Sequence, residues 1–223
     1  MAAAGEIQPH KSRPPNCLFQ KRSLEYSPAK AESLHRKRNC FIQMKYDLEP
    51  YCTGLGEQQP NGLRNLKDEL LKGINMIATV DDQSFRLVAN GTGSVGGQFR
   101  HNLDFVNSLL NGIEYGCIDY NKRERDLRVE ENREFAVGRF REAIDRLSGV
   151  SQRQLSKSVL VRSELDQATW LPSSFAREAE FVHSHTVHHH ALIREKLAGF
   201  GITVTETFGV APSTLEYWEK KAA

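Results

Sequence analysis

The segment FVHSHTVHHH, residues 181–190, holds five of the chain's eight histidines and lies inside a longer stretch with helical periodicity. On a helix each residue advances about 100° around the axis. Relative to Ala179, an arc from about 200° to 360° collects the apolar side chains Phe175, Phe181, Val182, Leu192, Ile193, Leu197 and Phe200. His185 and His189 fall inside this arc, at about 240° and 280°. We therefore expect an amphipathic helix that directs two histidines, one turn apart, toward the protein interior.

The other three histidines of this segment fall at or beyond the borders of the arc. His183 and His190 lie near about 40° and 20°, and His188 lies near about 180°. Two inward imidazoles one turn apart can bind the same divalent ion. They can equally hydrogen-bond to each other or to a backbone carbonyl in a core. The pair by itself leaves both interpretations open.

A second amphipathic helix is predicted around residues 94–113, with Ser94 or Thr92 as its N-cap. Its apolar residues recur every three or four positions: Val95, Phe99, Leu103, Val106, Leu110 and Ile113. His101 lies on the flank of this apolar face, about 40° beyond Phe105. That position suits a metal ligand at the open end of a helix bundle and equally suits an exposed histidine.

Two further long helices and one long connection complete the expected fold. Leu63, Leu66, Leu70, Ile74 and Ile77 mark one helix face, and a stripe from Phe135 to Leu147 marks another helix that ends at Gly149. Between the third and fourth helices, residues 158–165 are rich in β-branched side chains and predict a strand or a hairpin with residues 168–171. Pro172, Ser173 and Ser174 are expected to open the last long helix, and Pro212 a short final one. The pattern predicts an all-α, four-helix bundle whose core can hold a metal between facing helices.

Two motifs resemble a known family of metalloproteins. SHTVHHHALI, residues 184–193, resembles the His-x-x-His-His signature in the last bundle helix of the DinB-like superfamily of YfiT-type metalloenzymes. VGGQFRHNLD, residues 95–104, resembles that superfamily's second-helix histidine motif, and IDYNKRERD (118–126) and FGVAPST (208–214) add support. Together these strings cover most of the chain from about Leu63 onward, in the order that the superfamily has.

The resemblance implies that three histidines bind one divalent metal ion, and the matching positions are His101, His185 and His189. His188 is the main alternative ligand, because the family motif has a histidine there too. Imidazole ligands suit zinc or nickel, with iron, manganese and copper as alternatives. Three protein ligands leave a coordination position open, which is typical of a catalytic site.

The resemblance also implies a class of reaction, since some members of the superfamily are transferases or isomerases that use a low-molecular-weight thiol. We expect a metal-dependent transferase or hydrolase that acts on a small-molecule substrate, with such a thiol as a candidate. The alternative is a non-catalytic metal-binding or stress-related helical bundle. Asp104 could orient His101, although a solvent-exposed acid is the preferred interpretation. Arg100, Arg123 and Arg125 could bind an anionic substrate or simply be solvated.

Charge divides the chain into two regions. Residues 1–43 carry eight Lys or Arg against three Asp or Glu and four of the eight prolines, so we expect a disordered basic extension, or a stretch upstream of a translation start at Met44. Residues 44–223 form the expected DinB-like domain, with a net charge of −3. That charge argues against DNA binding, and the short basic cluster at residues 36–38 does not reverse the conclusion.

The remaining composition indicates a cytoplasmic protein. There is no run of 18 apolar residues and no secretory leader, so no membrane association is expected. The four cysteines, Cys17, Cys40, Cys52 and Cys117, show no paired spacing and are read as ordinary reduced thiols. The sequence leaves open whether the chain forms a homodimer.

Overall fold

The computed structural model describes residues 61–88 and 93–222. These residues all belong to Ile42–Ala223, one of two units into which the chain divides. The expected basic extension 1–43, its boundary at Met44 and the alternative N-cap Thr92 lie outside the described residues.

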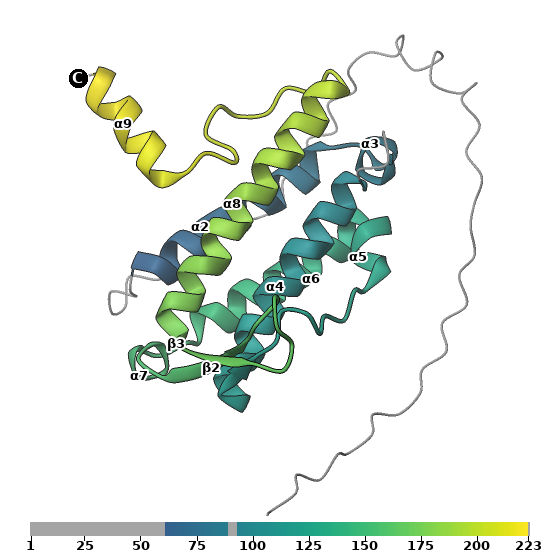
Figure 1. Cartoon of the computed structure of the whole chain (residues 1–223). Coiled ribbons are helices and arrows are strands. Elements are labelled where there is room, and N and C mark those ends of the chain that lie inside the picture. Colours follow the sequence, from purple (N-terminus) through teal and green to yellow (C-terminus); the bar gives the residue numbers. More distant parts are fainter. Residues whose placement is uncertain (1–60, 89–92, 223) are drawn as a thin grey trace, which may run out of the picture. The chain divides into compact units, whose positions relative to one another are not determined.

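Four long helices make up most of the described part: α2 (Asn61–Thr79), α4 (Val95–Tyr115), α6 (Arg133–Ser148) and α8 (Phe175–Gly199). Helices α2 and α4 each pack against both α6 and α8 (Figure 1), so every long helix contacts two others. The expectation of a mostly helical fold is confirmed. Within the described ranges, no helix is long and apolar enough to cross a membrane.

The apolar stripes predicted from periodicity form the core. All five apolar residues that marked the face of α2, Leu63, Leu66, Leu70, Ile74 and Ile77, are fully buried. Helix α8 contributes Val182, Ile193 and Leu197 to the same cluster. Burying each such side chain contributes about 1.5–3 kcal/mol, and this apolar packing holds α8 against α2 and α4.

Local signals set the ends of the helices that carry the site. The Ser94 hydroxyl accepts a hydrogen bond from the Gly97 N–H at 2.9 Å, which makes Ser94 the N-cap of α4 as predicted. Helix α4 ends at Gly116, whose φ of 68° is left-handed and therefore favours glycine. Ser174 caps the start of α8 through the Arg177 N–H. These caps fix the starting points of both helices.

A three-stranded sheet and four short helices lie between or after the long helices. The sheet has the order β1 (Cys117–Ile118), β2 (Ser158–Arg162), β3 (Trp170–Ser174), with β1 and β2 parallel and β2 and β3 antiparallel. The short helices are α3 (Asp82–Arg86), α5 (Leu127–Glu131), α7 (Gln152–Leu155) and α9 (Pro212–Ala222). Of these short helices, only α9 was predicted.

The expected hairpin is confirmed, but its boundaries differ from the prediction and a third strand, β1, pairs with it. Val161 pairs with Leu171, and the second strand continues through Pro172 to Ser174, where the sequence predicted the opening of a helix. Ser158 and Ser174 still pair at the far end, so the helix begins only at Phe175. The strand β1 was not expected, because two residues carry too little periodicity to reveal a strand. The described fold is therefore mostly helical with a small sheet and is not purely α-helical.

Candidate metal centre

Three histidines from two helices meet on one side of the α4–α8 contact. His101 comes from α4, and His185 and His189 come from successive turns of α8. Each offers one ring nitrogen, and these three nitrogens all lie within 4.8 Å of one another. The Nε2 atoms of His101 and His185 are 3.1 Å apart, and the His189 ring centre lies 4.5 Å and 4.4 Å from those of His101 and His185. The structure thus brings together the three positions selected from the sequence.

All three imidazoles are neutral near pH 7. Burial, followed by the charge that the neighbouring His189 would carry, lowers the pKa of His101 to about 4. Burial and His101 lower the pKa of His185 to about 4, and burial and His185 lower that of His189 to about 3. A neutral imidazole keeps one nitrogen lone pair, which is what a metal ion requires of a histidine ligand.

Gln98 orients His189 from helix α4. The Gln98 Oε1 atom lies 2.6 Å from His189 Nδ1, and a carbonyl oxygen can only accept, so the proton of the ring is on Nδ1. The lone pair of His189 is then on Nε2. Such a contact is typical of the groups that orient histidine ligands in metal sites. The sequence analysis did not single out Gln98, although its position three residues before His101 places it on the same side of the helix.

Arg123 makes the corresponding contact to His101, with the opposite polarity. Its Nη1 donates to His101 Nδ1 at 3.1 Å, and its guanidinium carbon lies 5.1 Å from the centre of the Phe105 ring. Since a guanidinium only donates, His101 Nδ1 carries the lone pair and Nε2 carries the proton. That proton points to His185 Nε2, which therefore accepts.

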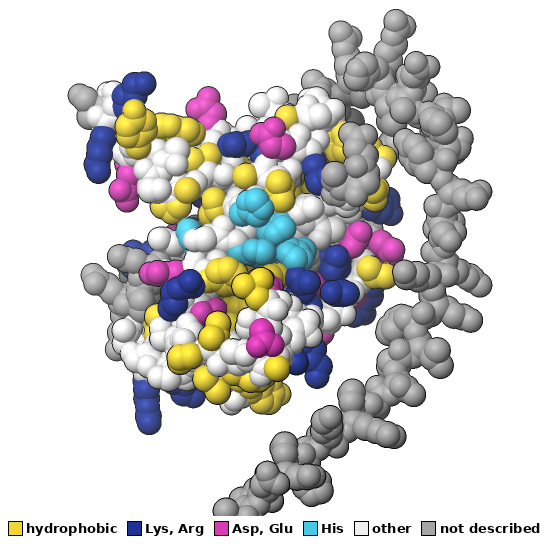
Figure 2. All heavy atoms as spheres, viewed as in Figure 1, with side chains coloured by type: hydrophobic (Ala, Val, Ile, Leu, Met, Phe, Trp, Pro, Cys, Tyr) yellow, Lys and Arg dark blue, Asp and Glu magenta, His cyan; other side chains and the backbone are white. Residues whose placement is uncertain are grey.

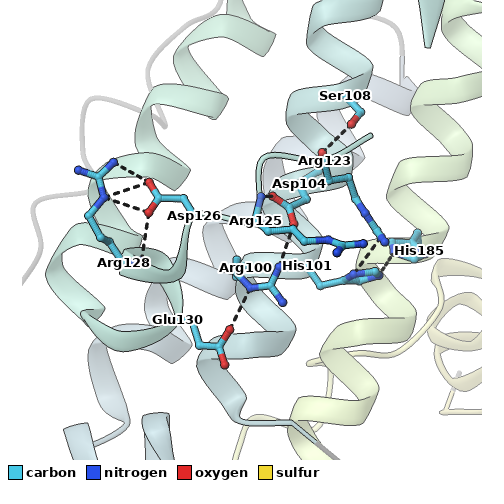
Figure 3. A network of polar contacts seen from close by, with 10 residues as sticks. All are labelled: Arg100, His101, Asp104, Ser108, Arg123, Arg125, Asp126, Arg128, Glu130 and His185. Atoms are coloured by element: carbon cyan, nitrogen blue, oxygen red, sulfur yellow. Dashed lines mark hydrogen bonds and ion pairs between the residues drawn. The ribbon is translucent and has the colours of Figure 1, made fainter. Parts of the chain in front are cut away.

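Asp104 is neither a hydrogen-bond partner of His101 nor a solvent-exposed acid, the two roles considered from the sequence. It is buried, with 7% of its surface exposed, so the preferred interpretation as a solvent-exposed acid is wrong. It also makes no hydrogen bond to His101: its carboxylate pairs with Arg100 at 3.1 Å and accepts from the Arg125 backbone N–H at 3.3 Å (Figure 3). Asp104 holds the segment after β1 against α4, because α4 leaves this carboxylate facing the backbone of that segment.

Aromatic rings form one wall of the site. Phe105 stacks on His185 with ring centres 3.9 Å apart, and Tyr120 stacks on Phe105 at 5.0 Å. Figure 2 shows histidine side chains gathered on one face of the molecule, with apolar side chains along one border and Lys or Arg side chains along another. The site therefore opens to solvent between an apolar wall and a cationic border.

The remaining histidines of α8 lie apart from the three-histidine group. His188 is exposed, and its ring centre is 5.3 Å from that of His189. His190 was placed at the edge of the apolar arc, but it is completely buried, and its Nδ1 donates to Glu69 Oε1 at 2.8 Å. Contact with α2 explains the difference, because a second helix covers the edge of the arc.

Glu69 is a buried carboxylate that the sequence analysis missed. Burial by itself would raise its pKa, but hydrogen bonds from His190 and from Lys72, at 2.7 Å, lower it overall. Burial lowers the pKa of His190, so a neutral imidazole donates to an ionised carboxylate. The position of Glu69 between Leu66 and Leu70, on the apolar face of α2, could have indicated from the sequence that this carboxylate is buried.

Cys117 is exposed at the start of β1 and does not belong to the histidine group. The other three cysteines lie outside the described residues.

Comparison with known proteins gives a limited result. The chain matches no protein-family model, and no solved structure matches it. A stretch of 108 residues is 29% identical to FK506-binding protein 5 from Rhizopus delemar. This stretch covers 47% of the chain and 28% of that protein, so the chain spans well under two thirds of the relative's length.

Proposed function

We propose that the chain is a metal-dependent enzyme of the DinB-like superfamily, in which His101, His185 and His189 hold one divalent ion. One observation carries the proposal: three neutral imidazoles from two helices place their ring nitrogens within 4.8 Å of one another. The closed cycle of contacts α2–α8–α4–α6 supports a four-helix bundle, the architecture of that superfamily.

The donor set fits such an ion. All three donors are imidazoles, which suit zinc or nickel, with iron, manganese and copper as alternatives. His185 and His189 already carry their lone pairs on Nε2, and Gln98 holds the ring of His189 in that tautomer. Three protein ligands leave room for a further ligand, and the site opens to solvent on one side.

The ion would supply Lewis acidity, which favours deprotonation of a water or thiol nucleophile. Side chains around the histidines determine the environment in which that nucleophile would react. Phe105 and Tyr120 form an apolar wall beside His185, which keeps water from that side of the site. We propose a small-molecule substrate, with a low-molecular-weight thiol as the candidate nucleophile, in a transferase or hydrolase reaction.

Elemental analysis tests the metal site. The full chain, purified without a histidine tag, is loaded with zinc or nickel and dialysed beside His101→Ala, His185→Ala and His189→Ala. We expect one ion per chain in the wild type and almost none in these variants, because two ligands hold a labile ion poorly. His188→Ala and His183→Ala are matched controls from the same helix and should keep their metal. Loss of the ion from His188→Ala alone would show that the ligand set is wrong.

Activity assays then separate the enzyme from the alternative, a non-catalytic metal-binding or stress-related bundle. Zinc-loaded protein is assayed for conjugation of glutathione to 1-chloro-2,4-dinitrobenzene and for hydrolysis of 4-nitrophenyl acetate. We expect one of these reactions to depend on the metal and on His185. A stoichiometric metal without either reaction would favour the non-catalytic alternative.

A further inference from the structure

The three histidines differ in which ring nitrogen carries the proton, and so in which nitrogen can bind a metal. His185 and His189 carry lone pairs on Nε2, whereas His101 carries a proton there. The cause is Arg123, which donates to Nδ1 of His101 and so takes up the single lone pair of that ring. For His101 Nε2 to become a ligand, the ring proton must move to Nδ1. Two donors, Nδ1–H and the guanidinium N–H, would then face each other, so Arg123 must turn away.

The arginines near the site differ in whether a carboxylate neutralises them. Arg100 forms ion pairs with two carboxylates, that of Asp104 at 3.1 Å and that of Glu130 at 2.9 Å. Within residues 61–88 and 93–222, neither Arg123 nor Arg125 forms an ion pair with a carboxylate. In Figure 3 the guanidinium groups of both point toward the histidine rings. Two guanidinium groups that form no ion pair with a described residue therefore border the site.

Arg123 also has an unused donor. Its Nε is buried, and none of the described residues accepts a hydrogen bond from it. A buried N–H without a partner costs about 1–3 kcal/mol, so such a group usually marks a place where a water, an ion or a ligand completes the arrangement. The planar fork of a guanidinium matches the two oxygens of a carboxylate or phosphate.

We propose that Arg123 binds an oxyanion of the substrate beside the metal, and that metal and oxyanion bind cooperatively because Arg123 must leave His101 for either to bind fully. This inference rests on the proposed metal site and adds a substrate class to it: small molecules that carry a carboxylate or phosphate group. Coupling between two ligands is reciprocal, so the oxyanion raises the affinity for the metal by the same factor as the metal raises that for the oxyanion.

Zinc affinity, measured by competition with a chromophoric chelator, tests the proposal. Sodium acetate and methyl phosphate serve as the two probes, and their arms distinguish a carboxylate from a phosphate. We expect at least one probe to raise the zinc affinity of the wild type by about fivefold or more. Arg123→Met should bind zinc more tightly than the wild type without any probe, since no hydrogen bond to His101 has to be broken, and should lose the response to the probe. Arg153→Met, at an exposed site on α7, should behave as the wild type.

A measurement on the unmodified chain avoids any effect of the substitution on folding. Long-range ¹H–¹⁵N NMR of the histidine rings should find the proton of His101 on Nε2 without zinc and on Nδ1 with zinc. If zinc binds through the three histidines while Arg123→Met leaves both its affinity and the probe response unchanged, Arg123 does not bind the oxyanion and the inference is wrong. Failure of the wild type to bind zinc at all would overturn the proposed function as well.

Discussion

Hydrogen bonds decide which nitrogen of each histidine is available as a ligand. Gln98 accepts from Nδ1 of His189, and Arg123 donates to Nδ1 of His101. Both contacts use the nitrogen that faces away from the three-histidine group, so they act on the group without belonging to it. Residues of this kind commonly change metal affinity by about 10 to 100-fold.

Gln98→Leu should therefore weaken zinc binding about 10 to 100-fold without abolishing it, because the ring of His189 loses the acceptor that fixes its tautomer. Gln98→Glu, which keeps an acceptor at this position, should retain most of the affinity. Chelator competition provides the measurement, and Gln83→Leu, an exposed change on α3, is the control. Equal affinity in Gln98→Leu and the wild type would exclude an orienting role.

At the scale of elements, close packing of α4 depends on the absence of a side chain at Gly96. A Cβ atom there would lie 2.2 Å from the backbone oxygen of Glu130 and 2.6 Å from a ring carbon of Phe85. These atoms belong to α5 and α3, so Gly96 lets two short helices cover the first turn of α4.

We expect Gly96→Ala to lower the free energy of unfolding by about 1–3 kcal/mol, since backbone atoms cannot move aside easily. Gly138→Ala is the matched control in α6, where a Cβ would meet nothing within 4 Å. It should raise the free energy of unfolding by about 0.5–1 kcal/mol, because alanine loses less conformational entropy in a helix than glycine. Urea unfolding measures both, and a stable Gly96→Ala protein would contradict the packing described here.

The sheet is tied to the segment after β1 by an ion pair whose strength should depend on pH. Asp119 accepts from Arg162 of β2 at 2.9 Å. Burial by itself would raise the pKa of Asp119, but hydrogen bonds from Arg162 and from the Asn121 backbone lower it overall. The ordinary pKa of an aspartate is 3.8, and a carboxyl whose pKa is lower in the folded state stabilises the fold at pH values above 3.8. That contribution is lost as the pH falls from 3.8 through the pKa of the folded state.

Asp119→Asn should consequently be less stable than the wild type at pH 7, by about 1 kcal/mol or less for a partly exposed pair. The difference should shrink as the pH falls below 3.8, where Asp119 becomes protonated in the wild type. Urea unfolding across pH 3–7 checks the trend, with the exposed Glu216→Gln as the reference. A difference that is constant with pH would mean that the charge of Asp119 is irrelevant.

At the scale of the whole molecule, a bound metal should join α4 to α8 and stabilise the fold. An ion that binds only the folded chain contributes about 2.7 kcal/mol at a free concentration one hundred times its Kd. Zinc should therefore raise the Tm of the wild type, and a chelator should reverse the rise. His185→Ala should show no rise, whereas His188→Ala should respond as the wild type does. An equal rise in His185→Ala would place the stabilising ion elsewhere.

The sequence by itself determined the features that depend on neighbours along the chain. The leucine and isoleucine spacing of α2 and the N-cap at Ser94 follow from helical periodicity and local hydrogen bonds. Periodicity also predicted that His185 and His189 share one side of α8, but the fully buried histidine of this helix is His190, and His185 is only partly buried. The family motif added His101, and the structure brings it to the other two. The metal itself remains a prediction.

Only the tertiary structure decided the features that depend on residues far apart in the sequence. Gln98 and His189 are separated by 91 positions, and Glu69 and His190 by 121. Periodicity shows which way a side chain points from its own helix, but the helix that covers it is set by packing. For that reason the burial of His190 and Asp104 was misjudged, and the contact that gives His101 the wrong tautomer for a metal ligand could be seen only after the segment after β1 had folded onto α4.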